Sequence, residues 1–297
     1  MRGHFLHPLL LLSCFASCEQ RIDEKPVGAS TDTEAEMQRY VRRAYLDLSG
    51  RPPDDATLAT ATSQLRDGGN TAATRGTFVD GLLASDAFAT VWVEELENSV
   101  LGGNTLDKQY AFLCGIVRGQ DRACDSCTAM DSCACSCSIL PSLLAERTQL
   151  SASAVDFAAS TPSSTIERRY AAAMGYFALA GTPEGRVKAL FDDFLARTAE
   201  LDEIENGRAM VIGALFPNTP AGLMFHRYGS NYTDLIEILF TSEVYREAMV
   251  RRVFERYLAR EPKSVELAYF VTTLDANQPD VRGLVRAVLA SREYFDQ

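Results

Sequence analysis

Two stretches of the sequence that lie far apart follow nearly the same pattern. RRAYLDLSGRPPDDATL spans residues 42–58, and RRVFERYLAREPKSVEL spans residues 251–267. When Arg51 is aligned with Arg260, the valine before the paired arginines, an aromatic residue, a proline and a leucine all fall in register. Self-similarity at this level indicates a repeated supersecondary unit, and it constrains the fold more than any other feature of the chain.

A third and more divergent copy, RVKALFDDFLARTAELDEI, spans residues 186–204. It keeps a valine, a phenylalanine and Arg197 in register, but Ala199 stands where the other two copies have proline. The copies also close with similar segments: LLASDAF at 82–88, LFTSEVY at 239–245 and LASREYF at 289–295. We therefore expect three related units along the chain.

The first unit begins with a pattern typical of an amphipathic helix. Apolar residues recur at steps of three and four, at Val41, Ala44, Tyr45 and Leu48. Pro53 is expected to stop this helix, because proline cannot donate the helical hydrogen bond and restricts the residue before it. Asp54 is expected to cap the helix that follows.

Two further helices complete the expected unit, the first of them ending at the glycine pair 68–69. Their apolar positions are Leu58, Leu65, Phe78, Val79, Leu82 and Leu83. The serines of the closing segments are expected to cap the next helix; they are Ser85, Ser242 and Ser291. Short amphipathic helices cannot bury their stripes separately, so each unit should pack as a small bundle. No alternating segment is long enough to indicate a sheet, and the expected class is all-α.

These patterns and the changes in composition divide the chain. We expect a lipoprotein signal peptide at 1–17, a flexible polar tether at 18–36, a first helical unit at 37–98, a cysteine-rich insertion at 99–150, a bridging segment at 151–185 with a helix near 166–179, a second unit at 186–248 and a third at 249–297. The apolar content of 46% is enough for a real core.

The N-terminus has the pattern of an export signal. Arg2 precedes an apolar run, residues 5–15, that is too short to span a bilayer. The next residues, Phe15-Ala16-Ser17-Cys18, resemble the lipobox of bacterial lipoproteins, in which a cysteine is acylated. The resemblance implies palmitate on Cys18, with Cys14 as a competing register, and Glu19 after the cysteine favours the outer membrane. The alternative is a soluble secreted protein whose signal ends near a cysteine.

The repeat pattern also carries a family resemblance. A V-R-x-x-[YF] helix, R-x-P, a leucine-bearing second helix and a closing L-x-S-x-x-[YF] resemble the helical repeat of secreted and surface bacterial proteins, which is similar to the phycobilisome linker polypeptides. RRAYLDLSGRPPDD also resembles an uncharacterised domain of large secreted bacterial proteins, often found near cytochrome modules. The copies cover residues 37–88 and 186–297. Because linker polypeptides organise other proteins, the resemblance implies a scaffolding role.

A cysteine-rich segment, CDSCTAMDSCACSCS at residues 124–138, separates the first unit from the other two. With Cys18 acylated and Cys14 removed, an even set of cysteines remains: Cys114, Cys124, Cys127, Cys133, Cys135 and Cys137. An even set in an oxidising compartment predicts disulfides that brace a loop with few apolar residues. The sequence leaves their pairing open.

Metal binding, haem attachment and thiol redox chemistry are the other functions that such cysteines serve. The clustered thiols at 124–137 have a spacing that also suits Cu(I) or Zn(II), so a metal site is the alternative to disulfides. A haem attachment site is excluded, because Thr128 stands where C-x-x-C-H requires histidine. A thioredoxin-like pair at Cys124 and Cys127 lacks the βαβ setting that it needs.

The chain contains no G-x-S-x-G elbow, no H-E-x-x-H and no phosphate-binding glycine loop. His226, in GLMFHRYGSNY, is expected to pack on a helix beside Phe225 and Tyr228, and Trp92 is expected in the core. Acidic runs that could serve a hydrolase are Glu94, Glu95, Glu97, Asp192, Asp193, Asp202, Glu203 and Glu205. Their spacing is typical of solvated helix faces. The repeated arginines could bind an anion, but a cation after a helix more often complements the negative end of that helix.

The net charge of −11 argues against a nucleic-acid partner. We expect a non-enzymatic, lipid-anchored protein of the cell envelope that needs no cofactor. It would act as a scaffold or adhesion component that binds other envelope proteins. The alternative is a metal- or redox-linked accessory protein that uses the cysteines at 124–137, and a carboxylate-dependent hydrolase is a more distant one.

Overall fold

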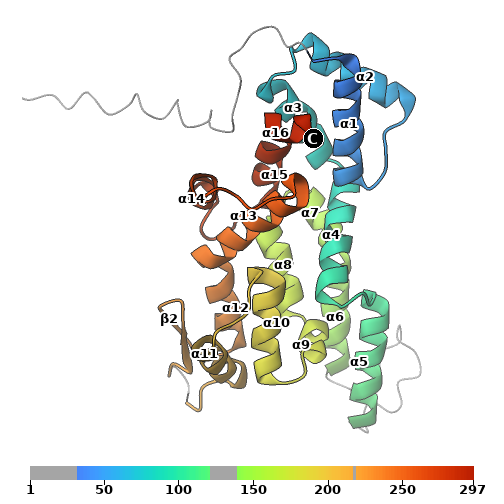
Figure 1. Ribbon diagram of the computed structural model, residues 1–297. Helices are drawn as coiled ribbons and strands as arrows, with labels where there is room; N and C mark the ends of the chain where they lie inside the picture. Colours follow the sequence, from blue (N-terminus) through green and yellow to red (C-terminus); the bar gives the residue numbers. More distant parts are fainter. Residues whose placement is uncertain (1–31, 121–138, 217–218) are drawn as a thin grey trace, which may run out of the picture.

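The computed structural model describes residues 32–120, 139–216 and 219–297, which form 16 helices and one two-stranded sheet (Figure 1). The expected all-α class is confirmed, with one short hairpin added. The first helices are α1 (Glu34–Ser49), α2 (Asp55–Asp67), α3 (Ala72–Leu83), α4 (Asp86–Val100), α5 (Leu106–Gln120), α6 (Ile139–Ser151), α7 (Ser153–Ala158) and α8 (Ser163–Ala172). They are followed by α9 (Met174–Leu179), α10 (Pro183–Leu195), α11 (Leu201–Ile212), β1 (Gly222–Met224), β2 (Arg227–Gly229), α12 (Tyr232–Phe240), α13 (Glu243–Leu258), α14 (Ser264–Thr273), α15 (Val281–Leu289) and α16 (Arg292–Asp296).

Helices α1, α2 and α3 begin at capped positions and pack against one another. The side chains of Thr33, Asp54 and Thr71 each accept a hydrogen bond from the third residue of the helix that follows. The cap expected at Asp54 is therefore confirmed. Of the expected apolar residues, the buried ones are Val41, Ala44, Leu48, Leu58, Leu65, Val79, Leu82 and Leu83. Tyr45 and Phe78 are half-buried against the same core.

Three helices end in a left-handed residue. These residues are Gly50 after α1, Ala196 after α10 and Ala259 after α13, with φ of 69°, 50° and 52°. A left-handed residue turns the chain out of the helix while its own N–H still bonds to the last turn. The next N-cap follows four positions later, at Asp54, Glu200 and Lys263. Pro53, which was expected to stop α1, lies after that helix has already ended.

The serines of the closing segments cap the helices that follow them, as expected. Ser85 Oγ accepts from Phe88 N at 3.2 Å, Ser242 Oγ from Tyr245 N at 3.1 Å, and Ser291 Oγ from Tyr294 N at 3.2 Å. The capped helices are longer than the closing segments suggested. The boundaries expected at 98/99 and 248/249 therefore fall inside α4 and α13. The boundaries expected at 36/37, 150/151 and 185/186 also fall inside helices, namely α1, α6 and α10.

The last two helices close the fold against the first three (Figure 1). Arg75 of α3 is buried, and its Nε donates to the main-chain oxygen of Ala290 at 2.8 Å. Tyr40 OH of α1 donates to the main-chain oxygen of Leu289 at 3.1 Å. Both acceptors lie at the C-terminal end of α15, where carbonyl groups have no partner within the helix. Side chains from α1 and α3 therefore supply hydrogen bonds to the free carbonyl groups at the end of α15.

Helices α4, α7 and α8 join this closed end to the rest of the fold (Figure 1). Trp92 of α4 stacks on Phe157 of α7 with ring centroids 4.4 Å apart, so its expected packing role is confirmed. The single helix expected near residues 166–179 is instead two helices. Ala173, between α8 and α9, is extended and interrupts the helix.

The left-handed turn after α13 gives a stability prediction. An alanine in this conformation is strained and a glycine is not, so we expect Ala259→Gly to raise the free energy of unfolding by about 1 kcal/mol. Ala59, which is exposed within α2, is the matched control, and Ala59→Gly is expected to lower stability by about 1 kcal/mol. Urea denaturation measures both. A loss of stability in both variants would contradict the left-handed turn.

Candidate binding surface

A β-hairpin packs along α11 on the side of the fold away from α1 (Figure 1). The strands are antiparallel, with Gly222 opposite Gly229, Leu223 opposite Tyr228 and Met224 opposite Arg227. Asn206 of α11 holds β1 in place, because its side-chain Oδ1 accepts from Leu223 N at 2.9 Å. The Nδ2 of the same residue donates to Asp202 O at 2.8 Å, which fixes the amide.

Two glycines allow the hairpin to approach its neighbours closely. A Cβ atom at Gly222 would lie 2.3 Å from the main-chain oxygen of Asn206. At Gly229 a Cβ atom would lie 2.9 Å from the sulfur of Met210. A larger residue at Gly222 would collide with main chain that cannot yield and would push the hairpin away from α11. The hairpin is therefore a packed part of the fold.

The turn between the strands is built from two bulky residues. Phe225 and His226 have φ of 47° and 62°, which is the left-handed pair that this two-residue turn requires. The ring of Phe225 is half-buried and lies 6.1 Å from the ring centroid of Phe191, so it anchors the turn to the core. His226 is exposed. The expectation that His226 packs on a helix is wrong, because the residue occupies a hairpin turn.

Five large apolar side chains are exposed around this hairpin, and we call them the hairpin surface. Their exposed fractions are 59% for Ile212, 94% for Leu215, 69% for Phe216, 40% for Leu223 and 71% for Tyr228. Leu223 and Tyr228 lie on one face, because they are opposite each other in the strand pair. A hydrogen bond of 2.8 Å from Ala214 N to Ser230 O holds the segment after α11 beside the end of β2. Grouped exposure of this kind is typical of a binding surface.

Arg197, from the repeat pattern, ties the end of α10 to α11 close to the hairpin. Its guanidinium donates two hydrogen bonds to Glu203, at 2.6 Å and 2.8 Å, and lies 4.8 Å from the ring centroid of Phe191. Burial alone would raise the pKa of Glu203, but the bonded guanidinium holds that pKa below its usual value. The partner of this arginine is therefore a glutamate of the next helix.

The matching arginines behave differently from each other. Arg260 repeats the arrangement, with both bonds to Glu266 at 2.9 Å and the guanidinium 5.1 Å from the ring centroid of Phe254. Arg51 is exposed, and Thr57 stands where the other two copies have glutamate. The three arginines therefore do not share one environment, and two of them link consecutive helices.

Some carboxylates expected on solvent faces are half-buried instead. Asp193 Oδ2 accepts from Tyr176 OH at 2.9 Å, and Glu97 Oε1 accepts from Leu106 N at 2.8 Å. Burial raises the pKa of both carboxyl groups. The expectation was wrong at these two positions, because each carboxylate faces a neighbouring segment, and it was wrong at Glu203, which is half-buried against Arg197. It is confirmed for the exposed acids, which are Glu94, Glu95, Asp192, Asp202 and Glu205.

A buried carboxylate that the sequence did not single out is Glu167 of α8. It accepts a hydrogen bond from Tyr245 OH at 2.7 Å and lies 3.4 Å from the guanidinium of Arg252. Both partners belong to α13, so the cluster joins α8 to α13. A buried carboxylate needs such partners because its desolvation is costly. Glu167 therefore serves the packing of two helices.

The cysteine predictions lie mostly outside the described residues. Cys114 is buried in α5. Cys18, Cys124, Cys127, Cys133, Cys135 and Cys137 fall outside the described ranges, so acylation, disulfides and metal binding stay predictions. Within those ranges, no group of three or more His, Cys, Asp or Glu side chains is arranged to hold a metal ion. None of the described helices is both long enough and apolar enough to cross a bilayer.

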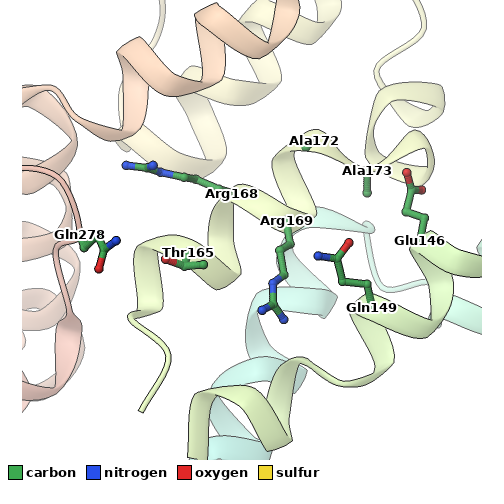
Figure 2. Close-up of a pocket in the computed structure, with 8 residues that line it drawn as sticks. All are labelled: Glu146, Gln149, Thr165, Arg168, Arg169, Ala172, Ala173 and Gln278. Carbon is green, nitrogen blue, oxygen red and sulfur yellow. The ribbon is translucent and has the colours of Figure 1, made fainter. Parts of the chain in front are cut away.

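An open cavity of about 560 Å³ lies beside α6 and α8 (Figure 2). It is lined by Glu146, Gln149, Thr165, Arg168, Arg169, Ala172, Ala173 and Gln278. Arg168 pairs with Glu237 at 2.8 Å and Arg169 pairs with Asp156. Figure 2 shows the two arginine side chains pointing in different directions. Since these groups are paired and do not converge, the cavity lacks the arrangement of a catalytic or anion-binding site.

Comparison with known proteins adds no relative: no family model, no curated protein and no solved structure matches the chain. The hairpin surface is therefore identified as a candidate site from its geometry alone. Sequence reasoning missed the hairpin surface. The available signal was the pair Gly222 and Gly229 at either end of a short segment rich in apolar residues.

Asp193 gives a pH-dependent prediction. Burial raises the pKa of Asp193 in the folded protein, so the folded state holds a proton on this carboxyl group more strongly than the unfolded state does. The contribution of Asp193 to the free energy of unfolding is therefore present below the unfolded pKa, and it is lost as the pH rises through the folded pKa. Asp193→Asn keeps an acceptor for Tyr176 and removes the charge. We expect this variant to be more stable than the wild type at about pH 7, and the difference to shrink toward about pH 4.

Urea denaturation across this pH range measures the effect. Asp192→Asn is the matched control, because it removes the same charge from the neighbouring exposed position. The same pH trend in both variants would show that burial of Asp193 is not its cause.

Proposed function

We propose that this protein is a non-enzymatic, lipid-anchored scaffold of the cell envelope that binds a protein partner through the hairpin surface. The observation that carries the proposal is the exposure of five large apolar side chains, two on a hairpin that packs tightly against α11 and three at the end of α11 and just after it. Phe216 and Tyr228 add rigid aromatic area, which loses little conformational freedom on binding. The partner would offer an apolar face to these side chains.

The polar groups of the fold support binding over catalysis. Glu167, Asp193 and Glu97 accept hydrogen bonds from neighbouring helices or segments. The arginines of the open cavity are paired with carboxylates and point apart. A carboxylate-dependent hydrolase needs two acids that face one substrate site, and these acids are used for packing instead.

We also propose that α1, α10 and α13 begin three copies of one unit. The left-handed turn that follows each helix and the equal spacing to the next N-cap support this relationship. The capping serines of the closing segments add a second shared feature. The resemblance of this pattern to phycobilisome linker polypeptides, which organise other proteins, favours the scaffold function over an enzymatic one.

The envelope location comes from the N-terminal motif. Cys18 would carry the acyl chain in the outer membrane, and the polar residues after it would connect the anchor to α1. Disulfides among Cys114 and the cysteines at 124–137 would brace the insertion, because exported thiols are usually oxidised. Metal binding by the same cysteines is the alternative.

The hairpin surface can be tested by photo-crosslinking in the native envelope. A photoreactive phenylalanine derivative placed at Phe216 or at Tyr228 is expected to give the same discrete adduct. The matched control is Val265 of α14, which is 69% exposed and lies outside the hairpin surface, and it should give no such adduct. Leu215→Ser is expected to abolish the adduct while changing the free energy of unfolding by less than about 0.5 kcal/mol. Equal adducts at all three positions would refute the proposed surface.

The anchor can be tested separately by labelling cells with palmitate. Cys18→Ser is expected to abolish labelling, because the thiol that accepts the acyl chain is removed. Cys14→Ser is the matched control and should leave labelling intact. Labelling lost only in the Cys14 variant would move the anchor to that residue, and no labelling of the wild type would refute the anchor.

A further inference from the structure

Three arginines near the start of the described chain make no hydrogen bond or ion pair within the described residues. Arg39 and Arg42 lie on α1, and Arg51 follows the left-handed turn that ends this helix. Other arginines of the described chain bond to carboxylates, hydroxyls or main-chain oxygens, as Arg66, Arg186 and Arg227 illustrate. Within the described ranges, Arg39, Arg42 and Arg51 are exposed and make neither a hydrogen bond nor an ion pair. Their charge is available to a partner outside the fold.

Arg39 and Arg42 lie on the outer side of the first unit, and Arg51 is exposed just beyond the C-terminal end of α1. The inner side of α1 is buried and consists of Met37, Tyr40, Val41, Ala44 and Leu48. Arg39, Arg42 and Leu46 are spaced by three and four residues, so they share the opposite side of the helix. Leu46 is 49% exposed between the charged groups. We call Arg39, Arg42, Leu46 and Arg51 the arginine face.

The acidic residues of α1 offset the charge of this face only in part. Glu34 pairs with Arg66 at 3.3 Å. Glu36 accepts hydrogen bonds from Thr33 in the capping box, and it also interacts electrostatically with Arg39 without forming an ion pair. Asp47 accepts from Tyr294 OH at 2.7 Å. The face is therefore basic, although the whole chain has a net charge of −11.

The chain before α1 limits the position of the arginine face. Residues 19–32 connect the proposed acyl site at Cys18 to the first described residue, Asp32. A chain of this length spans at most about 50 Å when fully extended. An anchored protein would therefore keep α1 within that distance of the lipid headgroups. This restriction raises the effective concentration of membrane surface at the arginine face.

We propose that the arginine face binds the anionic phospholipid headgroups of the membrane that holds the acyl anchor. This inference rests on the lipid anchor proposed above. Each guanidinium near an anionic surface contributes about fivefold to membrane partitioning, or about a hundredfold for all three arginines together. Guanidinium groups suit phosphate because their fixed N–H donors match its oxygens. Leu46 and the apolar stems of the arginines contact the region just below the headgroups.

Vesicle partitioning of the complete chain carrying Cys18→Ser tests the proposal without a contribution from an acyl chain. Vesicles of phosphatidylcholine alone are compared with vesicles in which about one third is phosphatidylglycerol, a fraction high enough to give the surface a negative potential. The ratio of the two partition coefficients isolates the electrostatic part, because apolar binding is common to both vesicles. We expect this ratio to fall about a hundredfold when Arg39→Gln, Arg42→Gln and Arg51→Gln are combined.

The matched control combines Arg208→Gln, Arg251→Gln and Arg286→Gln, which removes the same charge from exposed arginines outside this face. For this control, the ratio of the two partition coefficients should stay within about threefold of the ratio for the parent chain, which keeps all its arginines. Thermal unfolding should show that both triple variants fold. An equal loss in the control, or no preference for phosphatidylglycerol in the parent chain, would overturn the proposal. Because this chain lacks the acyl site, failure of the anchor appears only in the palmitate experiment.

Discussion

The buried guanidinium of Arg75 is the interaction on which the closure of the fold depends. With 2% of its surface exposed, this charge requires hydrogen-bond acceptors inside the protein. It donates to the main-chain oxygens of Asn70 and Ala290, which joins α3 to the end of α15. Asn70 in turn donates to Asp32 at 2.6 Å, and Asp32 also accepts from Arg292 of α16 at 2.8 Å. The same network therefore closes the chain and fixes the point at which it enters α1.

The local structure of the helices could be predicted because its causes lie within a few residues. The serine caps and the apolar stripe of α1 follow from short-range rules, and both were predicted from spacing. Tertiary partners could not be predicted in this way. Arg43 and Arg252 match in the aligned segments, yet Arg43 bonds to the main-chain oxygen of Tyr257 and Arg252 to Glu167. The same position thus meets different neighbours, because each segment packs against a different part of the chain.

The hairpin surface was outside the reach of sequence rules for a related reason. A two-residue turn is normally recognised by Asn-Gly or a similar pair, and here Phe225 and His226 adopt the left-handed conformation instead. Their strain is offset by tertiary contacts, since the ring of Phe225 packs near Phe191 and the strands pack along α11. The exposure of Leu215 and Tyr228 also depends on that packing. Composition alone does not distinguish an exposed leucine from a buried one.

The two proposed surfaces together define how a scaffold of this shape would work. The hairpin surface and α1 lie on different sides of the fold (Figure 1). Membrane contact through the arginine face would therefore leave the apolar side chains of the hairpin surface free for a protein partner. The buried contacts of Arg75 would hold the closing helices rigidly against α1, and the contact of Glu167 with α13 would extend this rigidity toward the middle of the fold. A partner bound at the hairpin would then keep a fixed orientation to the bilayer, which an anchor alone does not provide.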